Sequence, residues 1–483
     1  VNPSARASST SFIFDGTGLT LAKGTAKTLS LKCDLKAAAS GSYSWGYDAE
    51  SAPSPTGLTS GQSVAAADLT ENDSIGQLMS AATGGTLSVT LDSTASYLIA
   101  TPGQTVTLAE LKYTATLEDI NVRQISLVMS GGASNTPSNL VNQEVTLWTG
   151  TTQVGSATFA SGDNATGTIT GFTVPKDGSK VLTIKGTIGG ISVSEAMNRS
   201  GEFPKVDYDG GNGLTSNYGT GASSGQTVSP SSAATAATGV RVMKAYPEFE
   251  RLALTDTTLK SQDGLAAYRF KVTAKYGDIS LAKWTFSVSS STASGSNATT
   301  SRFSLYAFTD SGFSSPDGDF SGTNNAGGLL NAGNRAMLTG NGDLGTGSQR
   351  VEIYPDKTAA GSATNTLKIP AGQSRWFELR MSVGSVAPSG TAENISIQLE
   401  GDSAFPTTHQ TGGGVGEMGQ SGLTTTQSTA KGVESSSNND LLWSPRSTSS
   451  NAGTAVLQDN DWTNGYGIPG LPATNMTAQV LSK

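Results

Sequence analysis

The feature that most restricts the fold of this chain is an internal repeat of a strand, a short acidic turn and a second strand. The stretch LKYTATLEDINVRQISLVMS (111–130) aligns with FKVTAKYGDISLAKWTFSVS (270–289) at an offset of 159, which matches Asp119 to Asp278. In both copies apolar and polar residues alternate, a pattern that indicates β-strands with one buried face. A repeated unit of this kind predicts tandem modules of one architecture.

A second repeated element is a hairpin that occurs three times. FTVPKDGSKVLTIKGTI (172–188) aligns with LKIPAGQSRWFELRMSV (367–383) at an offset of 195. LAKGTAKTLSLKCDL (21–35) aligns with the central copy from Val174 onward at an offset of 153. Each copy has a turn signal between two runs of strand-forming residues.

The second strand of this hairpin predicts specific core residues. In KVLTIKGTI the apolar residues of one face are Leu182, Ile184 and Ile188. Because side chains alternate between the faces of a strand, these three are expected to point inward. In the later copy the corresponding inward residues are Phe377, Leu379, Met381 and Val383.

These alignments predict four parts: a truncated module at 1–85, a full module at 86–240, a larger full module at 241–430 and a C-terminal tail at 431–483. The rise in offset from 159 to 195 places an insertion of 36 residues within 309–347, expected to form an elaborated surface loop. Only 14% of residues are charged, and strand-like runs alternate with turn signals. We therefore predict an all-β fold of tandem Ig-like β-sandwich modules with Gly/Ser/Thr-rich loops.

The early position of the first hairpin leads to an expectation about assembly. The strands that precede this hairpin in a full module have no counterpart before Ser8, so we expect an incomplete sandwich at 1–85. Such a sandwich exposes unpaired strand edges unless another strand covers them. We expect a neighbouring subunit to donate that strand, from the tail at 441–483. A head-to-tail contact of this kind propagates into a filament or lattice.

Charge, hydropathy and cysteine content exclude several classes of partner. The net charge is −8 and no run of Lys or Arg is present, so nucleic acid is not an expected partner. No apolar run approaches eighteen residues, so no membrane span is expected. The single cysteine, Cys33, excludes an intramolecular disulfide framework.

Motifs for catalysis are weak in this sequence. A single histidine, His409, lies in a Gly/Thr-rich stretch and cannot alone build a zinc site or a catalytic triad with its acid and nucleophile. GASSG (221–225) matches G-x-S-x-G, and 340–345 and 414–419 match G-x-G-x-x-G, but none lies in the strand-turn-helix context that these motifs require. We therefore expect no enzyme and no cofactor beyond a metal ion.

Calcium is the one cofactor that the sequence leaves open. In SPDGDFSG (315–322), Asp317 and Asp319 alternate and offer the hard oxygen ligands that Ca²⁺ prefers. The spacing is not that of an EF-hand loop. The same Asp-Gly pairs form ordinary turns, which is the interpretation that the composition favours.

The module pattern TVTLAELKYTATLEDINVRQISLVMSG, followed by VTLWTGTTQVGSATF and FTVPKDGSKVLTIKGTI, ends in WSP, DNDWTNGYGIPGLP and LSK. This arrangement resembles the modular exported surface proteins of ultra-small Patescibacteria (candidate phyla radiation), and the resemblance covers nearly the whole chain. It implies an extracellular, cell-surface location and a structural role in an S-layer, filament or attachment structure. It carries no catalytic residues over.

Three functions follow from these observations as hypotheses. The first is a self-assembling extracellular structural protein whose partners are copies of itself, as in a cell-surface filament or S-layer. The alternative is an adhesin that binds a host or a glycan through the insertion at 309–347. An exported hydrolase is disfavoured because one histidine and scattered carboxylates offer no clear catalytic cluster.

Overall fold

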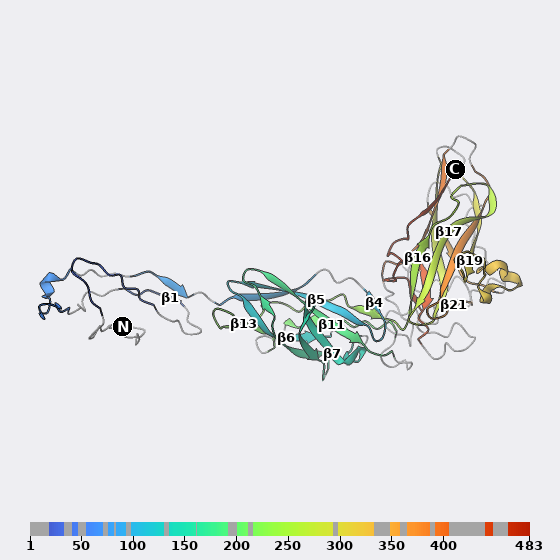
Figure 1. Cartoon of the computed structure of the whole chain (residues 1–483). Helices are drawn as coiled ribbons and strands as arrows, with labels where there is room; N and C mark the ends of the chain where they lie inside the picture. The colour runs from blue at the N-terminus through green and yellow to red at the C-terminus, as the bar shows by residue number, and fades with distance from the viewer. Residues whose placement is uncertain are drawn as a thin grey trace.

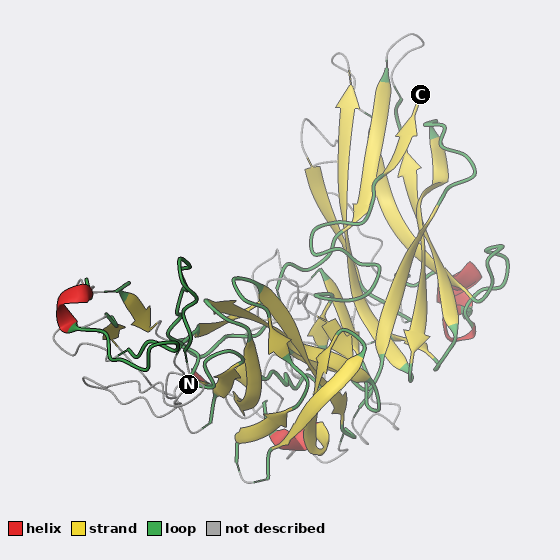
Figure 2. Cartoon of the chain, turned by 60° about the vertical axis from the view of Figure 1, so that its left-hand side comes forward, coloured by secondary structure: helices red, strands yellow, loops and turns green. Residues whose placement is uncertain are grey.

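The computed structural model describes residues 19–32, 41–46, 55–70, 76–81, 84–92, 98–129, 135–160, 162–191, 200–210, 216–292, 298–332, 348–357, 365–386, 392–404, 440–447 and 462–483. Strands dominate these residues, and helices are confined to short 3-10 turns (Figure 2). The predicted all-β fold is confirmed. No helix of the described residues is long and apolar enough to cross a membrane.

The central module is a sandwich whose layers join through one strand. Its ladder order is β14-β13-β6-β9-β8-β7-β11-β5-β3, and β10 and β12 also pair with β6. Strand β8 pairs with β7 on one side and β9 on the other, so it connects the layers. The elements are β3 (Thr86–Leu91), β4 (Leu98–Ala100), β5 (Thr105–Thr116), β6 (Ile120–Val128), η2 (Pro137–Asn139), β7 (Leu140–Thr149), β8 (Thr152–Thr158), β9 (Asn164–Ile169), β10 (Thr173–Val174), β11 (Ser179–Ile188), β12 (Asp207–Tyr208), β13 (Tyr218–Gly221), β14 (Thr227–Val228) and β15 (Val240–Val242).

The C-terminal module has two separate sheets around one core (Figure 1). One sheet has the order β16-β17-β22-β19, and the other has the order β25-β24-β18-β23-β26 with β20 and β21 also on β18. The elements are β16 (Tyr246–Leu252), β17 (Gln262–Lys275), β18 (Ile279–Thr292), β19 (Thr300–Phe308), η4 (Gly318–Phe320), η5 (Thr323–Gly328), β20 (Ser348–Ile353), β21 (Leu367–Ile369), β22 (Ser374–Val383), β23 (Glu393–Leu399), β24 (Leu441–Ser444), β25 (Thr463–Asn464) and β26 (Gln479–Ser482).

The strand registers of the two modules follow the repeat in the sequence. Leu182 of β11 pairs with Leu111 of β5, and Phe377 of β22 pairs with Phe270 of β17. These pairs are related by the offsets of 195 and 159 that the sequence alignment gives. The repeated stretches therefore fold into equivalent strand pairs.

The predicted inward residues lie in the two cores. Leu182, Ile184 and Ile188 are at most 1% exposed and belong to the core of the central module. In the C-terminal module the four predicted residues are 0% to 4% exposed, and they are Phe377, Leu379, Met381 and Val383. The alternation of the sequence thus identified the buried face of this hairpin correctly.

The C-terminal tail differs from the expectation. Its strand β24 pairs with β18, and β26 pairs with β23 of the same chain. All four residues of β24 are buried, so the tail lies inside its own module. The prediction that 441–483 is donated to a neighbouring subunit is therefore wrong for the described residues 440–447 and 462–483, because they already complete a sandwich in cis.

The described part of the insertion, 309–332, covers a sheet edge instead of projecting as a free loop. Leu330 N–H donates to the carbonyl of Leu305, and Asp317 N–H donates to the carbonyl of Ala307, both on the outer edge of β19. Phe320 is fully buried in the module core. A covered edge cannot pair with another chain, so this edge is unsuited to assembly.

The leading segment, residues 19–81, has few elements among its described residues. They are β1 (Gly41–Tyr43), η1 (Ala66–Asp68) and β2 (Met79–Ala81). Strands β1 and β2 pair with each other in an antiparallel two-stranded ladder. A two-stranded ladder by itself is only marginally stable in water.

Candidate functional site

The turn of the repeated hairpin has the same geometry in all three copies. The N–H of Gly178 donates to the carbonyl of Pro175 at 3.1 Å, and Asp177 between them has a φ of +52°. In the C-terminal module the N–H of Gln373 donates to Pro370 at 3.0 Å. The leading segment has the same turn, since the N–H of Thr25 donates to the carbonyl of Ala22 at 3.0 Å. The equivalent of Asp177 there is Gly24, at a φ of +73°.

What differs is the burial of the face that follows this turn. Leu182 and Ile184 of the central module are 0% exposed. Their counterparts in the leading segment, Leu29 and Leu31, are 60% and 52% exposed. Among the described residues, 26–32 lie outside every ladder. Within the described residues, the leading segment therefore has the turn of the repeated hairpin, and the apolar side chains that follow it are exposed.

Other apolar side chains of the leading segment are exposed as well. Of eleven large apolar residues that are exposed in the described chain, seven lie within 19–81. They are Leu21, Leu29, Leu31, Leu58, Val64, Leu78 and Met79. Exposed apolar side chains that form a contiguous patch mark interaction sites, so this segment is the candidate interaction region of the described chain. We call Leu21, Leu29 and Leu31 the open face.

The two predicted calcium ligands lie in different environments. Asp317 is buried, accepts a hydrogen bond from the N–H of Asp319 at 2.9 Å, and forms an ion pair with Arg375 at 2.5 Å. Asp319 is exposed. In the described residues no group of three His, Cys, Asp or Glu side chains is placed to hold a metal ion. Asp317 anchors the insertion to β22, and calcium binding stays a prediction.

The motif GASSG (221–225) forms a turn after β13 that binds a carboxylate. The backbone N–H groups of Gly85, Ser223 and Ser224 donate to Glu118 at 2.8 to 2.9 Å, and the Ser224 hydroxyl donates at 2.6 Å. Burial by itself would raise the pKa of Glu118, but these hydrogen bonds lower it to about 2. Glu118 thus joins the β5–β6 turn to the β13–β14 turn through the serines and to the start of β3 through Gly85. His409, Cys33 and the two G-x-G-x-x-G matches lie outside the described residues.

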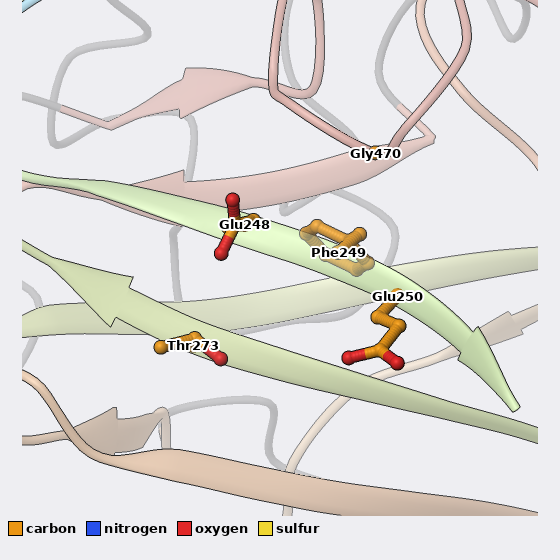
Figure 3. Close-up of a pocket in the computed structure, with 5 residues that line it drawn as sticks. All are labelled: Glu248, Phe249, Glu250, Thr273 and Gly470. Atoms are coloured by element: carbon orange, nitrogen blue, oxygen red, sulfur yellow. The ribbon is translucent and has the colours of Figure 1, made fainter.

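A shallow hollow of about 330 Å³ lies beside the edge strand β16 and its neighbour β17 in the C-terminal module (Figure 3). Glu248 and Glu250 of β16 and Thr273 of β17 line it, and Gly470 approaches from the loop that passes β16. Both carboxylates have cationic partners at 2.9 Å, Lys275 for Glu248 and Lys271 for Glu250. The hollow therefore offers paired surface charges instead of free catalytic groups.

A buried carboxylate that the sequence analysis missed holds the tail in place. Asp402 is 0% exposed and accepts hydrogen bonds from the N–H groups of Asp440, Leu441 and Gly465 at 2.7, 3.2 and 2.7 Å. Burial raises the pKa of Asp402 to about 7, against the opposing effect of these hydrogen bonds. This one side chain therefore joins β23, β24 and the turn after β25.

Two cations lie near this carboxylate. Lys283 is 0% exposed and its Nζ lies 3.1 Å from Glu352. Arg350 pairs with Glu400 at 2.7 Å and also with Asp440 of the tail. Burial lowers the pKa of Lys283, and the attraction of Glu352 opposes that shift. The contact of Arg350 with Asp440 adds to the attachment of the tail to its own module.

Comparison with known proteins gives weak similarity only. No protein-family model matches the chain, and no curated protein matches it. The major pilin subunit BcpA of Bacillus cereus has 9% identity and a TM-score of 0.19 over 68% of this chain, which spans only 62% of the pilin. The C-terminal domain of the Streptococcus pyogenes antigen I/II-family protein AspA has 9% identity and a TM-score of 0.15, over 65% of this chain and 95% of that domain.

The fibronectin(III)-like modules of Clostridium thermocellum CbhA have 12% identity and a TM-score of 0.13, over 65% of this chain and 85% of that one. At such TM-scores the similarity does not establish a common topology.

Proposed function

We propose that this chain is an extracellular structural protein that assembles with copies of itself, as a subunit of a cell-surface filament or S-layer, through β-strand complementation. The observation that carries the proposal is the exposure of Leu29 and Leu31, whose counterparts Leu182 and Ile184 are fully buried. Burying such side chains is worth about 1.5–3 kcal/mol each. A complementary strand therefore gains apolar burial and main-chain hydrogen bonds together.

The repeat indicates what kind of strand covers the open face. In the central module β11 pairs with β5 on one side and β7 on the other. In the C-terminal module β22 pairs with the equivalent strands, β17 and β19. The occupant we propose is thus a strand of a second copy that takes the position beside residues 26–32 that β5 or β7 has beside β11. The described tail is not that strand, because it is paired in its own module.

A surface location is part of the same proposal. It rests on the composition, with 14% charged residues and abundant Ser and Thr, and on the resemblance to exported modular proteins. The alternative of an adhesin that binds a host or a glycan through the insertion at 309–347 stays a hypothesis, and 333–347 of this insertion lies outside the described residues. The described part of the insertion covers β19 and its packing supports a structural role.

The test compares two double variants within residues 28–31. In L29K/L31K the added charges lie on the open face, whereas in T28K/S30K the added charges replace the alternate side chains, which point away from that face. We expect the starting protein and T28K/S30K to form polymers in electron micrographs and light scattering, and L29K/L31K to stay monomeric. A starting protein that stays monomeric at high concentration, or an L29K/L31K variant that polymerises normally, contradicts the proposal.

A further inference from the structure

The chain enters and leaves the central module through two short strands that run parallel. Leu98, Ile99 and Ala100 of β4 pair in register with Val240, Arg241 and Val242 of β15. The N–H of Met243 continues this pairing by donating to the carbonyl of Ala100 at 2.9 Å. All other pairs between the named strands are antiparallel in the described residues, so β4 and β15 form an exception that needs a reason.

The C-terminal module has the same arrangement. Thr258 forms a parallel bridge with Ser482 near the end of β26. The N–H of Leu259 donates to the carbonyl of Ser482 at 2.9 Å, and the N–H of Ser482 donates to the carbonyl of Thr257 at 3.0 Å. Ile99 and Thr258 are separated by 159 positions, the offset of the repeat. In both modules the segment by which the chain enters pairs in parallel with the segment by which it leaves. We call this pairing the parallel closure, and it is a property of the module.

We propose that this parallel closure is the element that carries tension along the chain. Tension pulls β4 from its N-terminal end and β15 from its C-terminal end. In a parallel pair these ends lie at opposite ends of the ladder, so the evenly spaced hydrogen bonds are sheared together. The strands between β4 and β15 then carry little of the force. The inference does not depend on whether copies of the chain assemble.

The surroundings of β15 strengthen the closure. The N–H groups of Val240 and Val242 donate to the carbonyls of Pro204 and Glu202, on the side away from β4. Arg241 donates to the carbonyl of Gly201 at 2.5 Å. Strand β15 is therefore bonded along both edges and cannot leave by a simple sideways displacement.

The neighbours of β4 tie the closure to the next module. Ile99 packs against the core of the C-terminal module, and Gln104 donates to the hydroxyl of Tyr276 at 2.7 Å. Figure 1 shows β4 at the end of the central module that faces the C-terminal module. Tension that reaches β15 is thus transmitted through a packed joint. Strand β3, which precedes β4 and pairs with β5, must detach before β4 is loaded from the N-terminal side.

The experiment is single-molecule stretching of the full chain with cysteine handles at two pairs of positions, in a Cys33→Ser background. In D92C/K244C the handles load β4 and β15 from opposite ends, which is the shear geometry. In T105C/K244C both strands are loaded from their C-terminal ends, which is a peeling geometry. Thr105 and Lys244 are exposed and Asp92 is half-buried, so the three replacements leave the cores intact.

The handles of D92C/K244C span 152 residues, or roughly 550 Å of extended chain, and those of T105C/K244C span 139 residues, or roughly 500 Å. We expect a release of the full length in each variant, at clearly higher force in the shear geometry. Equal release forces in the two variants overturn the proposal, as does a roughly 550 Å release without a resolved force peak in D92C/K244C. Equal thermal midpoints of the two variants show that both are folded before stretching.

Discussion

Phe270 of β17 and Phe377 of β22 lie directly opposite each other, and their rings stack with centroids 4.7 Å apart and planes 4° apart. The central module has Leu111 and Leu182 in the same register. In the leading segment the position of Leu182 is taken by Leu29, which is 60% exposed. One position of the repeat thus occurs in a stacked aromatic pair, in an aliphatic pair and on an open face.

This series predicts that alanine at this position lowers the free energy of unfolding by a different amount in each of the three copies. Phe377→Ala is expected to destabilise its module by about 4 kcal/mol and Leu182→Ala by about 3 kcal/mol, since each leaves a cavity. Leu29→Ala is expected to change the free energy of unfolding of the monomer by less than about 0.5 kcal/mol, because Leu29 is 60% exposed. Urea unfolding of the monomeric protein measures all three. A Leu29→Ala cost equal to that of Leu182→Ala would show that the open face is covered in the monomer.

The sequence predicted the strand pairs of the repeat well because their signal is long and periodic. Ile120 and Ile279 are related by the offset of 159, and each pairs with the first strand of its hairpin, through Val174 and Ile369. By contrast β4 and β15 have three residues each, too few for a period to be visible. Their parallel pairing depends on residues about 140 positions apart, which a local pattern does not encode.

The tail and its attachment were missed for a related reason. In LLWS all four side chains of β24 are buried, so the strand shows no alternation to identify it. Lys283 alternates with apolar residues in β18 and would be placed in solvent on that pattern, yet it is fully buried beside Glu352. Burial of a charge in this way requires a partner from a distant strand, which only the fold supplies.

Glu118 predicts an acid-sensitive central module. The pKa of Glu118 is about 2 in the folded chain, compared with the ordinary value of 4.5 that we take for the unfolded chain. The unfolded chain then binds more protons between these values, so stability is present above pH 4.5 and is lost as pH falls toward 2. Glu118→Gln is expected to cost about 2 kcal/mol at neutral pH, because four hydrogen bonds to a charge are weakened. Thermal unfolding from pH 7 to pH 2 should show the variant and the starting protein converging.

Asp402 predicts the opposite pH effect in the C-terminal module. The pKa of Asp402 is raised from 3.8 to about 7 in the folded chain. Its contribution to the free energy of unfolding is therefore complete below pH 3.8 and is lost as the pH rises through 7. Asp402→Asn should flatten this dependence and cost about 1–3 kcal/mol, because one amide oxygen replaces two carboxylate acceptors. Thermal unfolding from pH 4 to pH 8 measures the slope. A slope that survives the substitution would assign it to another group.

The ion pair of Asp317 and Arg375 predicts how the insertion is held. Both side chains are largely buried, so Asp317→Asn leaves a guanidinium without its charge partner and should cost about 3–5 kcal/mol. The covered edge of β19 is then expected to open, with faster hydrogen exchange at the N–H groups of Leu305 and Leu330 and faster proteolysis within 309–332. Asp319→Asn is the matched control, because Asp319 is exposed and is bonded there through its backbone N–H. If added calcium raises the melting temperature of the starting protein and not of either variant, Asp317 and Asp319 bind the ion together and the ion pair with Arg375 gives way to it.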